Sequence, residues 1–318
     1  MLAERAALGL LAIDTETTGV GWHDQAFMVS VATDTETLVF DKRNTSGTQW
    51  QDDLLRVNRM LHEATHIIMH NAKFDLQKLI SIGFDSYLFA TKFEDTQAIA
   101  HLIDEKQSTS LKYLARVVLG EETDEDEVLK VWRRKNKLKK EDGYEPIPNE
   151  ILAPYAAKDA EFTLRLYKTL WPRLPKDLHD LYNMEKSLTW ALLNVEAQGM
   201  SIDKAYVTDK RREYGDRIYK LKQRIGELVG KEFNPQSHQQ VLHALSERGF
   251  VVSSTSKDAL REVDDELARL ILELRECNKI KATYFDALHE EARDGILHPN
   301  FRQHGTRTGR MSSGAAEA

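Results

Sequence analysis

The sequence predicts an α/β domain over residues 1–175, followed by an all-α region. Short apolar runs at Leu8–Ile13 and His66–His70 have the length of buried strands. After residue 175, apolar residues recur at three- and four-residue spacing, which is typical of helices that bury one face. Pro172 and Pro175 mark a boundary between the two regions. A chain of 318 residues is long enough for two domains.

Two acidic residues stand where the first predicted strand ends. Asp14 and Glu16 are two residues apart, so both side chains point to the same face of a strand. Such paired carboxylates suit a hard divalent cation, Mg²⁺ or Mn²⁺. Asp14–Thr17 reads Asp-Thr-Glu-Thr, and the same tetrapeptide recurs at Asp34–Thr37. The second copy lies between two short β-prone runs, a pattern that predicts a hairpin. We therefore assign metal binding to Asp14 and Glu16, and an exposed turn to Asp34 and Glu36.

Two further segments carry candidate site residues. Asp75 follows the strand at His66–His70 and lies in the first turn of a predicted helix, where an acidic residue is also favoured for ordinary structural reasons. Tyr155 and Asp159 are four residues apart on a predicted helix, 150–170, and share one face of it. Four carboxylates and a tyrosine in this order suit a two-metal nuclease.

Composition limits the class of protein. Hydrophobic residues make up 41% and charged residues 30% of the chain, as in globular proteins. A single cysteine, Cys277, excludes an internal disulfide framework and suits a reducing compartment. Leu8–Ile13 is too short to span a membrane, and no basic segment marks a secretory signal. We expect a cytoplasmic protein with no membrane partner.

The net charge of −7 is unevenly distributed. Residues 1–175 carry 22 basic and 28 acidic residues, and residues 176–318 carry 22 and 23. Within the first part, an acidic run at Glu121–Glu127 is followed by a basic run at Arg133–Lys140. This segment reads either as a surface helix with self-compensating charge or as a phosphate-contacting arm beside a catalytic cleft.

The three acidic segments resemble the 3′→5′ proofreading exonuclease of family A DNA polymerases, of the DEDD type with tyrosine in the third motif. The resemblance covers residues 8 to about 172 and implies a ribonuclease H-like fold, a mixed sheet with flanking helices. Phe93–Gln97 and Ser110–Ala115 also resemble this domain. The residues that match its three motifs are, in order, Asp14 and Glu16, Asp75, and Tyr155 with Asp159.

The resemblance implies two divalent metal ions, Mg²⁺ or alternatively Mn²⁺. Asp14 would bridge both ions, Glu16 and Asp159 would complete the first site, and Asp75 would hold the second. Tyr155 and Glu16 would orient the attacking water, and the product would be a nucleoside 5′-monophosphate.

Three polar residues beside these motifs are candidates for contact with the terminal nucleotide. They are Thr17, His70 and Asn71. Each could equally satisfy local backbone groups.

The second region resembles the polymerase thumb, predicted for residues 176–300, and residues 301–318 resemble the incomplete start of a palm domain. Arg275 and Lys279 lie four apart and are candidates for DNA backbone contacts. Thr308–Ser313 resembles the motif at the entry to the palm, in which an arginine contacts the primer strand. Arg310 takes that role here, and Gly309 would allow a close backbone approach.

Palm carboxylates and a fingers helix are not found among these residues. We therefore expect a DNA exonuclease that does not polymerise alone, in a bacterial or phage-infected cell. Its expected partners are a single-stranded DNA 3′ end, primer-template DNA and a separate palm and fingers polypeptide. The alternatives are an RNA-trimming exonuclease of the ribonuclease D group and a non-catalytic primer-template binding subunit of a split polymerase.

Overall fold

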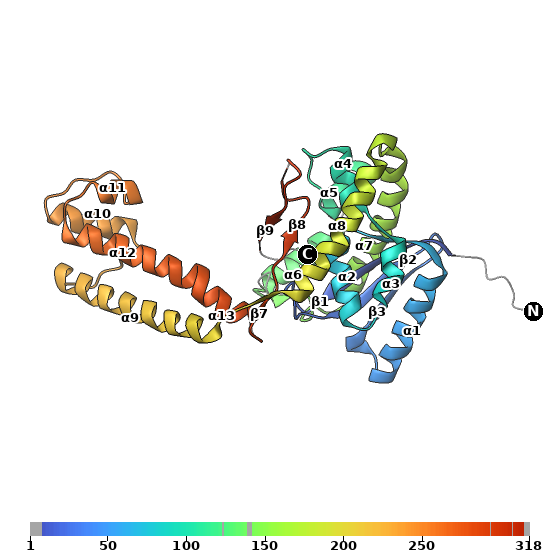
Figure 1. The fold of residues 1–318 in the computed structure, drawn as a ribbon, viewed down its shortest axis with the longest axis horizontal. Coiled ribbons are helices and arrows are strands. Elements are labelled where there is room, and N and C mark those ends of the chain that lie inside the picture. Colours follow the sequence, from blue (N-terminus) through green and yellow to red (C-terminus); the bar gives the residue numbers. More distant parts are fainter. Residues whose placement is uncertain (1–7, 123, 139–141, 293, 307, 315–318) are drawn as a thin grey trace, which may run out of the picture. The chain divides into compact units, whose positions relative to one another are not determined.

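The computed structural model describes residues 8–122, 124–138, 142–292, 294–306 and 308–314. The chain forms two compact units (Figure 1). The first combines the chain up to Gln198 with the segment from Pro299 onward, and the second is Gly199–His298. The chain thus leaves the first unit and later returns to it.

A mixed sheet forms the centre of the first unit (Figure 1). Its strands are β1 (Leu8–Thr17), β2 (Ala26–Ala32), β3 (Thr37–Asp41), β4 (Ala64–Met69) and β5 (Phe93–Asp95), in the order β3-β2-β1-β4-β5. Strand β1 runs antiparallel to β2 and parallel to β4, while β2 and β3 are antiparallel and β4 and β5 parallel. The predicted mixed sheet, with the predicted strands in β1 and β4, is confirmed.

Helices cover both faces of this sheet. They are α1 (Gly47–Glu63), α2 (Ala72–Ser81), α3 (Ser86–Lys92), α4 (Thr96–Ile103), α5 (Leu111–Leu119), α6 (Asp124–Lys135), α7 (Asn149–Leu170) and α8 (His179–Gln198). Leu11 and Ile13 of β1 belong to the core shared with α1, α2 and α3. Ala12 belongs to the core shared with α4, α5 and α7. Alternation along β1 therefore turns the even-numbered residues, Asp14 and Glu16 among them, toward α7.

The second Asp-Thr-Glu-Thr copy forms the turn that the sequence predicts. Asp34 and Glu36 are exposed between β2 and β3. The Glu36 carbonyl accepts a hydrogen bond from the Thr33 N–H at 2.8 Å, which closes the turn. The sequence therefore distinguished the buried copy from the exposed one correctly.

Helix α8, which the sequence prediction grouped with the thumb-like region, belongs to the first unit. The buried Tyr182 hydroxyl accepts the Asp95 N–H at 2.9 Å and lies 2.7 Å from a Glu94 carboxylate oxygen. Lys186 bonds the same carboxylate at 2.9 Å. These contacts fix α8 to β5, so the first unit extends beyond the predicted boundary at residue 175.

The returning segment also packs on the first unit. It contains β8 (Phe301–Arg302) and β9 (Ser312–Ser313), which pair antiparallel. Lys73 of α2 is paired with Glu196 of α8 and donates hydrogen bonds to the Asn300 side chain at 3.0 Å and the Phe301 carbonyl at 2.5 Å. One half-buried lysine thus joins α2, α8 and the returning segment.

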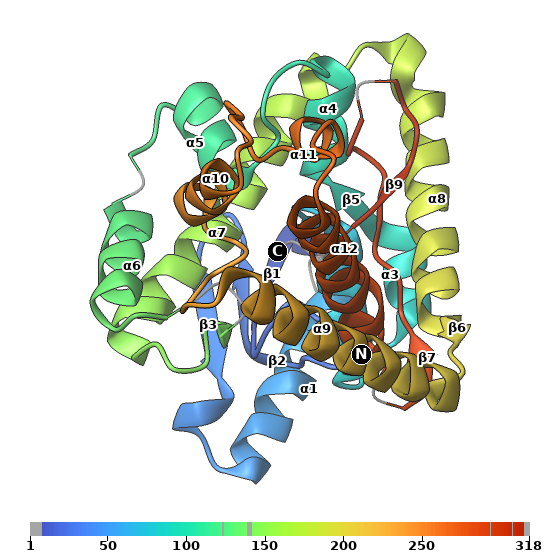
Figure 2. The ribbon, with the colours of Figure 1, turned by 90° about the vertical axis from the view of Figure 1, so that its left-hand side faces the viewer.

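The second unit is helical apart from a short antiparallel pair of strands, β6 (Met200–Ser201) and β7 (Ile296–Leu297). Its helices are α9 (Lys204–Val229), α10 (His238–Glu247), α11 (Lys257–Arg261), α12 (Glu266–Ile280) and α13 (Ala287–Glu291), with a π-helical stretch at Lys281–Asp286. Helices α9 and α12 lie side by side (Figures 1 and 2). The Ser237 side chain caps α10. None of the helices described here has the length and apolar character needed to cross a membrane.

The packing of the returning segment predicts a pH effect on stability. The rings of His304 and His101 lie 5.0 Å apart, and burial, with the nearby His101, lowers the pKa of His304 from 6.5 to about 4. Between these values the unfolded chain binds a proton that the folded chain does not, so stability falls as pH drops through this window. The free energy of unfolding of the wild type should therefore fall when the pH is lowered from 6.5 to 5. We expect this fall to be smaller by about 1 to 2 kcal/mol in His304→Gln.

Chemical denaturation at the two pH values measures this difference. The exposed His62→Gln is a matched control. An identical pH dependence in wild type and His304→Gln would contradict the lowered pKa of the half-buried His304.

Candidate active site

Three carboxylates meet where β1 ends and α7 crosses the sheet. Asp14 and Glu16 project from β1, and Asp159 comes from α7, which packs on β1. One possible ligand atom from each of the three lies within 4.8 Å of the others. Glu16 and Asp159 are buried, while Asp14 keeps part of its surface accessible. Grouped oxygen donors of this kind fit a hard divalent cation.

Asp75 lies beside this group but is not one of its three members. Its carboxylate accepts a hydrogen bond from the Thr15 hydroxyl at 2.7 Å. Thr15 stands between Asp14 and Glu16 on β1, so one short strand segment carries two of the predicted carboxylates and contacts a third. Burial raises the pKa of Asp75 to about 7, and the Asp75 charge helps to raise that of Asp14.

Burial and mutual repulsion disfavour the charged form of these groups. Burial is the main cause that raises the pKa values of Asp14, Glu16 and Asp159. For Asp14, the charges of Asp75, Glu16 and Asp159 raise it further, in that order. A bound cation would relieve this repulsion, which is a physical reason to expect metal binding here.

Tyr155 shares a face of α7 with Asp159 and is buried. Burial, followed by the charge of Asp159, raises the pKa of its phenol well above the ordinary range. The hydroxyl therefore stays protonated near neutral pH and can donate a hydrogen bond. The ring of Tyr144 packs against that of Tyr155 at 6.0 Å and 74°, a T-shaped contact.

Asp95 holds the helix that carries Asp75. Its carboxylate accepts the backbone N–H groups of Asn71 at 3.1 Å and Ala72 at 2.9 Å, where α2 begins. It also accepts the Gln97 N–H at 2.8 Å, which caps α4. Asn71 has a positive φ of 62°, an uncommon conformation that these bonds stabilise. Phe93–Gln97 belongs to the resemblance, but no local pattern in the sequence predicts the role of Asp95.

The three predicted nucleotide-contacting residues have local partners. The Thr17 hydroxyl donates to the Gly19 carbonyl at 2.7 Å. His70 Nδ1 lies 2.8 Å from the Thr96 hydroxyl, and Asn71 forms the turn before α2. These contacts fit the alternative in which the three residues bond neighbouring groups of the fold. Contact with the terminal nucleotide stays a prediction.

Lys112 is a site residue that sequence reasoning missed. It lies on α5 and forms an ion pair with Asp159. Its Nζ stands 3.9 Å from the centroid of the Tyr155 ring, within the range of a cation–π contact. Ser110–Ala115 belongs to the resemblance, but no local pattern in it points to a lysine at the site.

The acidic and basic run before α7 forms α6. Lys130 pairs with Asp126 at 2.6 Å, as expected for self-compensating charge. The Arg133 guanidinium lies 5.0 Å from the centroid of the Tyr144 ring, and Tyr144 packs on Tyr155. The basic end of α6 is therefore next to the site. Lys139 and Lys140 of the predicted basic run lie outside the described residues.

The predicted DNA-binding residues of the second half are not brought to the carboxylate group by any described contact. Arg275 Nη1 donates to the Thr255 carbonyl at 2.5 Å, and Lys279 is exposed on α12. Arg310 is exposed, and its carbonyl accepts the Thr306 hydroxyl at 2.7 Å. Gly309 has a φ of +71°, which explains glycine there, while a Cβ would meet nothing within 4 Å. DNA contact by these residues stays a prediction.

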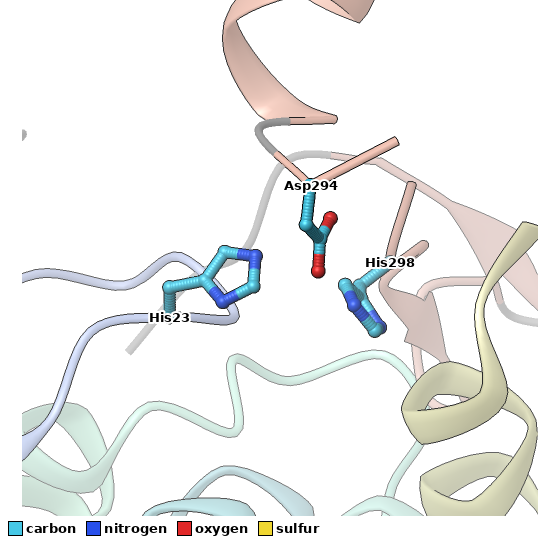
Figure 3. A group of neighbouring side chains, drawn as sticks. All are labelled: His23, Asp294 and His298. Atoms are coloured by element: carbon cyan, nitrogen blue, oxygen red, sulfur yellow. The ribbon is translucent and has the colours of Figure 1, made fainter. Parts of the chain in front are cut away.

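Figure 3 draws another set of possible metal ligands, His23, Asp294 and His298. His23 belongs to the first compact unit, and the other two belong to the second. We assign no site to them. The Asp294 carboxylate accepts the Ile296 N–H at 3.1 Å, a bond that supports the start of β7.

Comparison with known proteins identifies the class to which this fold and site belong. A family model described as 3′-5′ exonuclease matches residues 1–175, and one described as DNA polymerase family A matches residues 204–316. The chain therefore belongs to the 3′-5′ exonuclease family of family A DNA polymerases. The first match ends at the boundary predicted from the sequence, whereas the compact units divide at Gln198.

Named relatives agree with this family. DNA polymerase I of Chloroflexus aurantiacus is 33% identical, over 77% of this chain and 27% of that protein. DNA polymerase DpoZ of Vibrio phage phiVC8 is 29% identical, over 94% of this chain and 53% of that protein. The chain thus spans about a quarter to a half of these relatives. The fold is similar to the POL domain of Pol1 from M. smegmatis in complex with DNA primer-template and dNTP, with a TM-score of 0.67 and 20% identity, over 97% of this chain and 52% of that one.

The role of Asp95 gives a test of how the site is held. Asp95→Asn keeps the shape of the side chain but leaves one oxygen to accept three backbone N–H groups. We expect unfolding free energy to fall by about 2 kcal/mol, because charge-assisted hydrogen bonds to buried N–H groups are lost. Nuclease activity should fall further than stability alone explains, since the first turn of α2 carries Asp75.

Denaturation and 3′-end digestion of the same protein preparation measure both effects. The exposed Asp34→Asn is the matched control. Wild-type activity in a folded Asp95→Asn protein would show that Asp95 does not position the site.

Proposed function

We propose that this chain is a divalent-metal-dependent 3′→5′ DNA exonuclease of the DEDD tyrosine type, which releases nucleoside 5′-monophosphates. One observation carries the proposal: Asp14, Glu16 and Asp159 offer ligand atoms within 4.8 Å of one another. Membership of the 3′-5′ exonuclease family supports it. The order of the five site residues and the tyrosine at position 155 support the subtype.

The donors are all carboxylate oxygens, so we propose Mg²⁺ as the physiological ion, with Mn²⁺ able to replace it. When bound, two such ions stabilise the attacking and the leaving oxygen of a phosphoryl displacement. Asp14, Glu16 and Asp159 would hold the first ion, and Asp75 would hold the second together with Asp14. The Tyr155 hydroxyl, which stays protonated, would orient the attacking water together with Glu16.

Primer-template DNA and its frayed 3′ end are the proposed ligands. The similar fold of a polymerase domain described in complex with primer-template DNA supports this choice. In the second half, Arg275, Lys279 and Arg310 would contact the DNA backbone, which positions DNA without reading its sequence. We assign hydrolysis to the site that residues 1–175 carry.

Removing the two strand carboxylates tests the assignment of the site. We expect the Asp14→Ala, Glu16→Ala double variant to lose mononucleotide release by at least about 1,000-fold, because the first metal would lose two ligands. Binding of a single-stranded oligonucleotide should remain measurable. Digestion of 3′-labelled DNA with Mg²⁺, followed by a binding titration in chelator, gives both values.

The sequence offers its own control for that experiment. An Asp34→Ala, Glu36→Ala double variant removes the same tetrapeptide's carboxylates from an exposed turn, and its activity should match wild type. Undiminished digestion by the Asp14, Glu16 variant would reject the assignment.

RNA trimming is the competing activity, since an enzyme of the ribonuclease D group would share the five site residues. The match of residues 204–316 to DNA polymerase family A favours DNA. We expect single-stranded DNA to be digested faster than an RNA oligonucleotide of the same sequence. Faster digestion of RNA would reverse the substrate assignment.

The basic end of α6 predicts a salt effect. Replacing Arg133, Arg134 and Lys135 by alanine should make the slope of log affinity against log salt shallower by about 2, because fewer counterions are released from single-stranded DNA. A matched triple change of exposed residues at Lys42, Arg56 and Arg59 should leave the slope unchanged. An unchanged slope in the α6 variant would remove the idea of a phosphate-contacting arm.

A further inference from the structure

A lysine reaches into the proposed metal site from outside the three motifs. Lys112 pairs with Asp159, and the exposed fractions of the two side chains are 16% and 9%. Its Nζ also stands 3.9 Å from the centroid of the Tyr155 ring. The ammonium group therefore contacts both residues that α7 contributes to the site.

Lys112 is held in this position by its helix. Leu114 and Ala115, on the same helix α5, are buried, and Leu114 packs in the core that also contains Ala160 and Leu164 of α7. Helices α5 and α7 are thus packed against each other next to the ion pair. The lysine stem is the flexible part of this arrangement.

The other cation near Glu16 is engaged elsewhere. Arg43, whose charge acts on Glu16, bonds Asp41 at 2.7 Å. Its Nη1 also donates to the carbonyls of Glu145 at 2.7 Å and Ile147 at 2.6 Å. Lys112, by contrast, has its ammonium on a carboxylate of the proposed metal site itself.

We propose that Lys112 is a resident counter-cation of this site: it holds Asp159 and Tyr155 in place before a divalent ion binds, and competes with that ion for Asp159. The inference rests on the proposed metal site. Lys112 occupies one oxygen of the Asp159 carboxylate, so an ion that binds Asp159 has to share this carboxylate with Lys112 or displace the lysine. The flexible stem allows that withdrawal without movement of α5. Lys112 is on this account a positioning residue.

The test is the affinity for Mn²⁺ in the absence of DNA, together with thermal stability in chelator. Lys112→Met removes the charge and keeps most of the stem. We expect its Mn²⁺ dissociation constant to fall about fivefold, because a competing charge is gone from the site. Its melting temperature in chelator should fall by about 3 to 6 °C, because the carboxylates lose their counter-charge, and excess Mn²⁺ should close this gap.

Two other variants make the result specific. Lys158→Ala removes a lysine that adjoins Asp159 in sequence but pairs with Glu161 at 2.9 Å, and it should change neither value. Lys112→Arg keeps the charge and should stay within about twofold of wild type in Mn²⁺ affinity. If Lys112→Met folds only with Mn²⁺ present, this outcome also supports the proposal, because the variant then depends on the ion for its stability. If it does not fold at all, Lys112→Gln takes its place in both measurements.

The failures of the two proposals are distinguishable. Unchanged or weaker Mn²⁺ binding by Lys112→Met, with wild-type binding intact, would overturn the role of Lys112 alone. A structural role alone would lower stability without raising metal affinity. Absence of Mn²⁺ binding in wild type, or binding that survives in the Asp14→Ala, Glu16→Ala variant, would instead overturn the proposed metal site.

Discussion

Carboxylates that are buried beside one another repel, and the surrounding structure has to hold them together. Here Asp14 and Glu16 are fixed by their ladder with β2, and Asp159 by the packing of α7 on the sheet. Burial and the neighbouring charges raise the pKa of Asp14, so the arrangement costs stability whenever the groups are charged. A bound cation would offset this repulsion. Cation binding is therefore a physical reason for a group of acidic residues that lowers the stability of the unliganded fold.

Hydrogen bonds in the rest of the first unit hold these carboxylates in position. Thr15 ties β1 to Asp75, and Asp95 fixes the start of the helix on which Asp75 lies. Asp95 is itself held through its N–H by Tyr182 of α8. The chain of contacts therefore runs from β1 through α2 and β5 to α8, which explains why α8 belongs with the sheet.

Much of this was predictable from local pattern. A period of two placed Asp14 and Glu16 on one face, and a spacing of four placed Tyr155 with Asp159. The flanking runs separated the buried Asp-Thr-Glu-Thr copy from the exposed one. Lys112 and the bonds of Asp95 were not predictable in this way, because they depend on how α5 packs against α7 and how β5 lies beside β4. The predicted boundary at residue 175 coincides with the end of the exonuclease family match, while the compact unit continues through α8, because an amphipathic helix does not reveal which core it joins.

The direction of digestion and the chemistry of the product distinguish a two-metal 3′→5′ exonuclease from other nucleases. A single-stranded DNA labelled at its 3′ end in one sample and at its 5′ end in another is digested with Mg²⁺, with and without chelator. We expect the 3′ label to be released as a nucleoside 5′-monophosphate and the 5′-labelled strand to shorten stepwise. Chelator should stop both. Release from the 5′ end, a 3′-phosphorylated product, or full activity in chelator would contradict the proposed function.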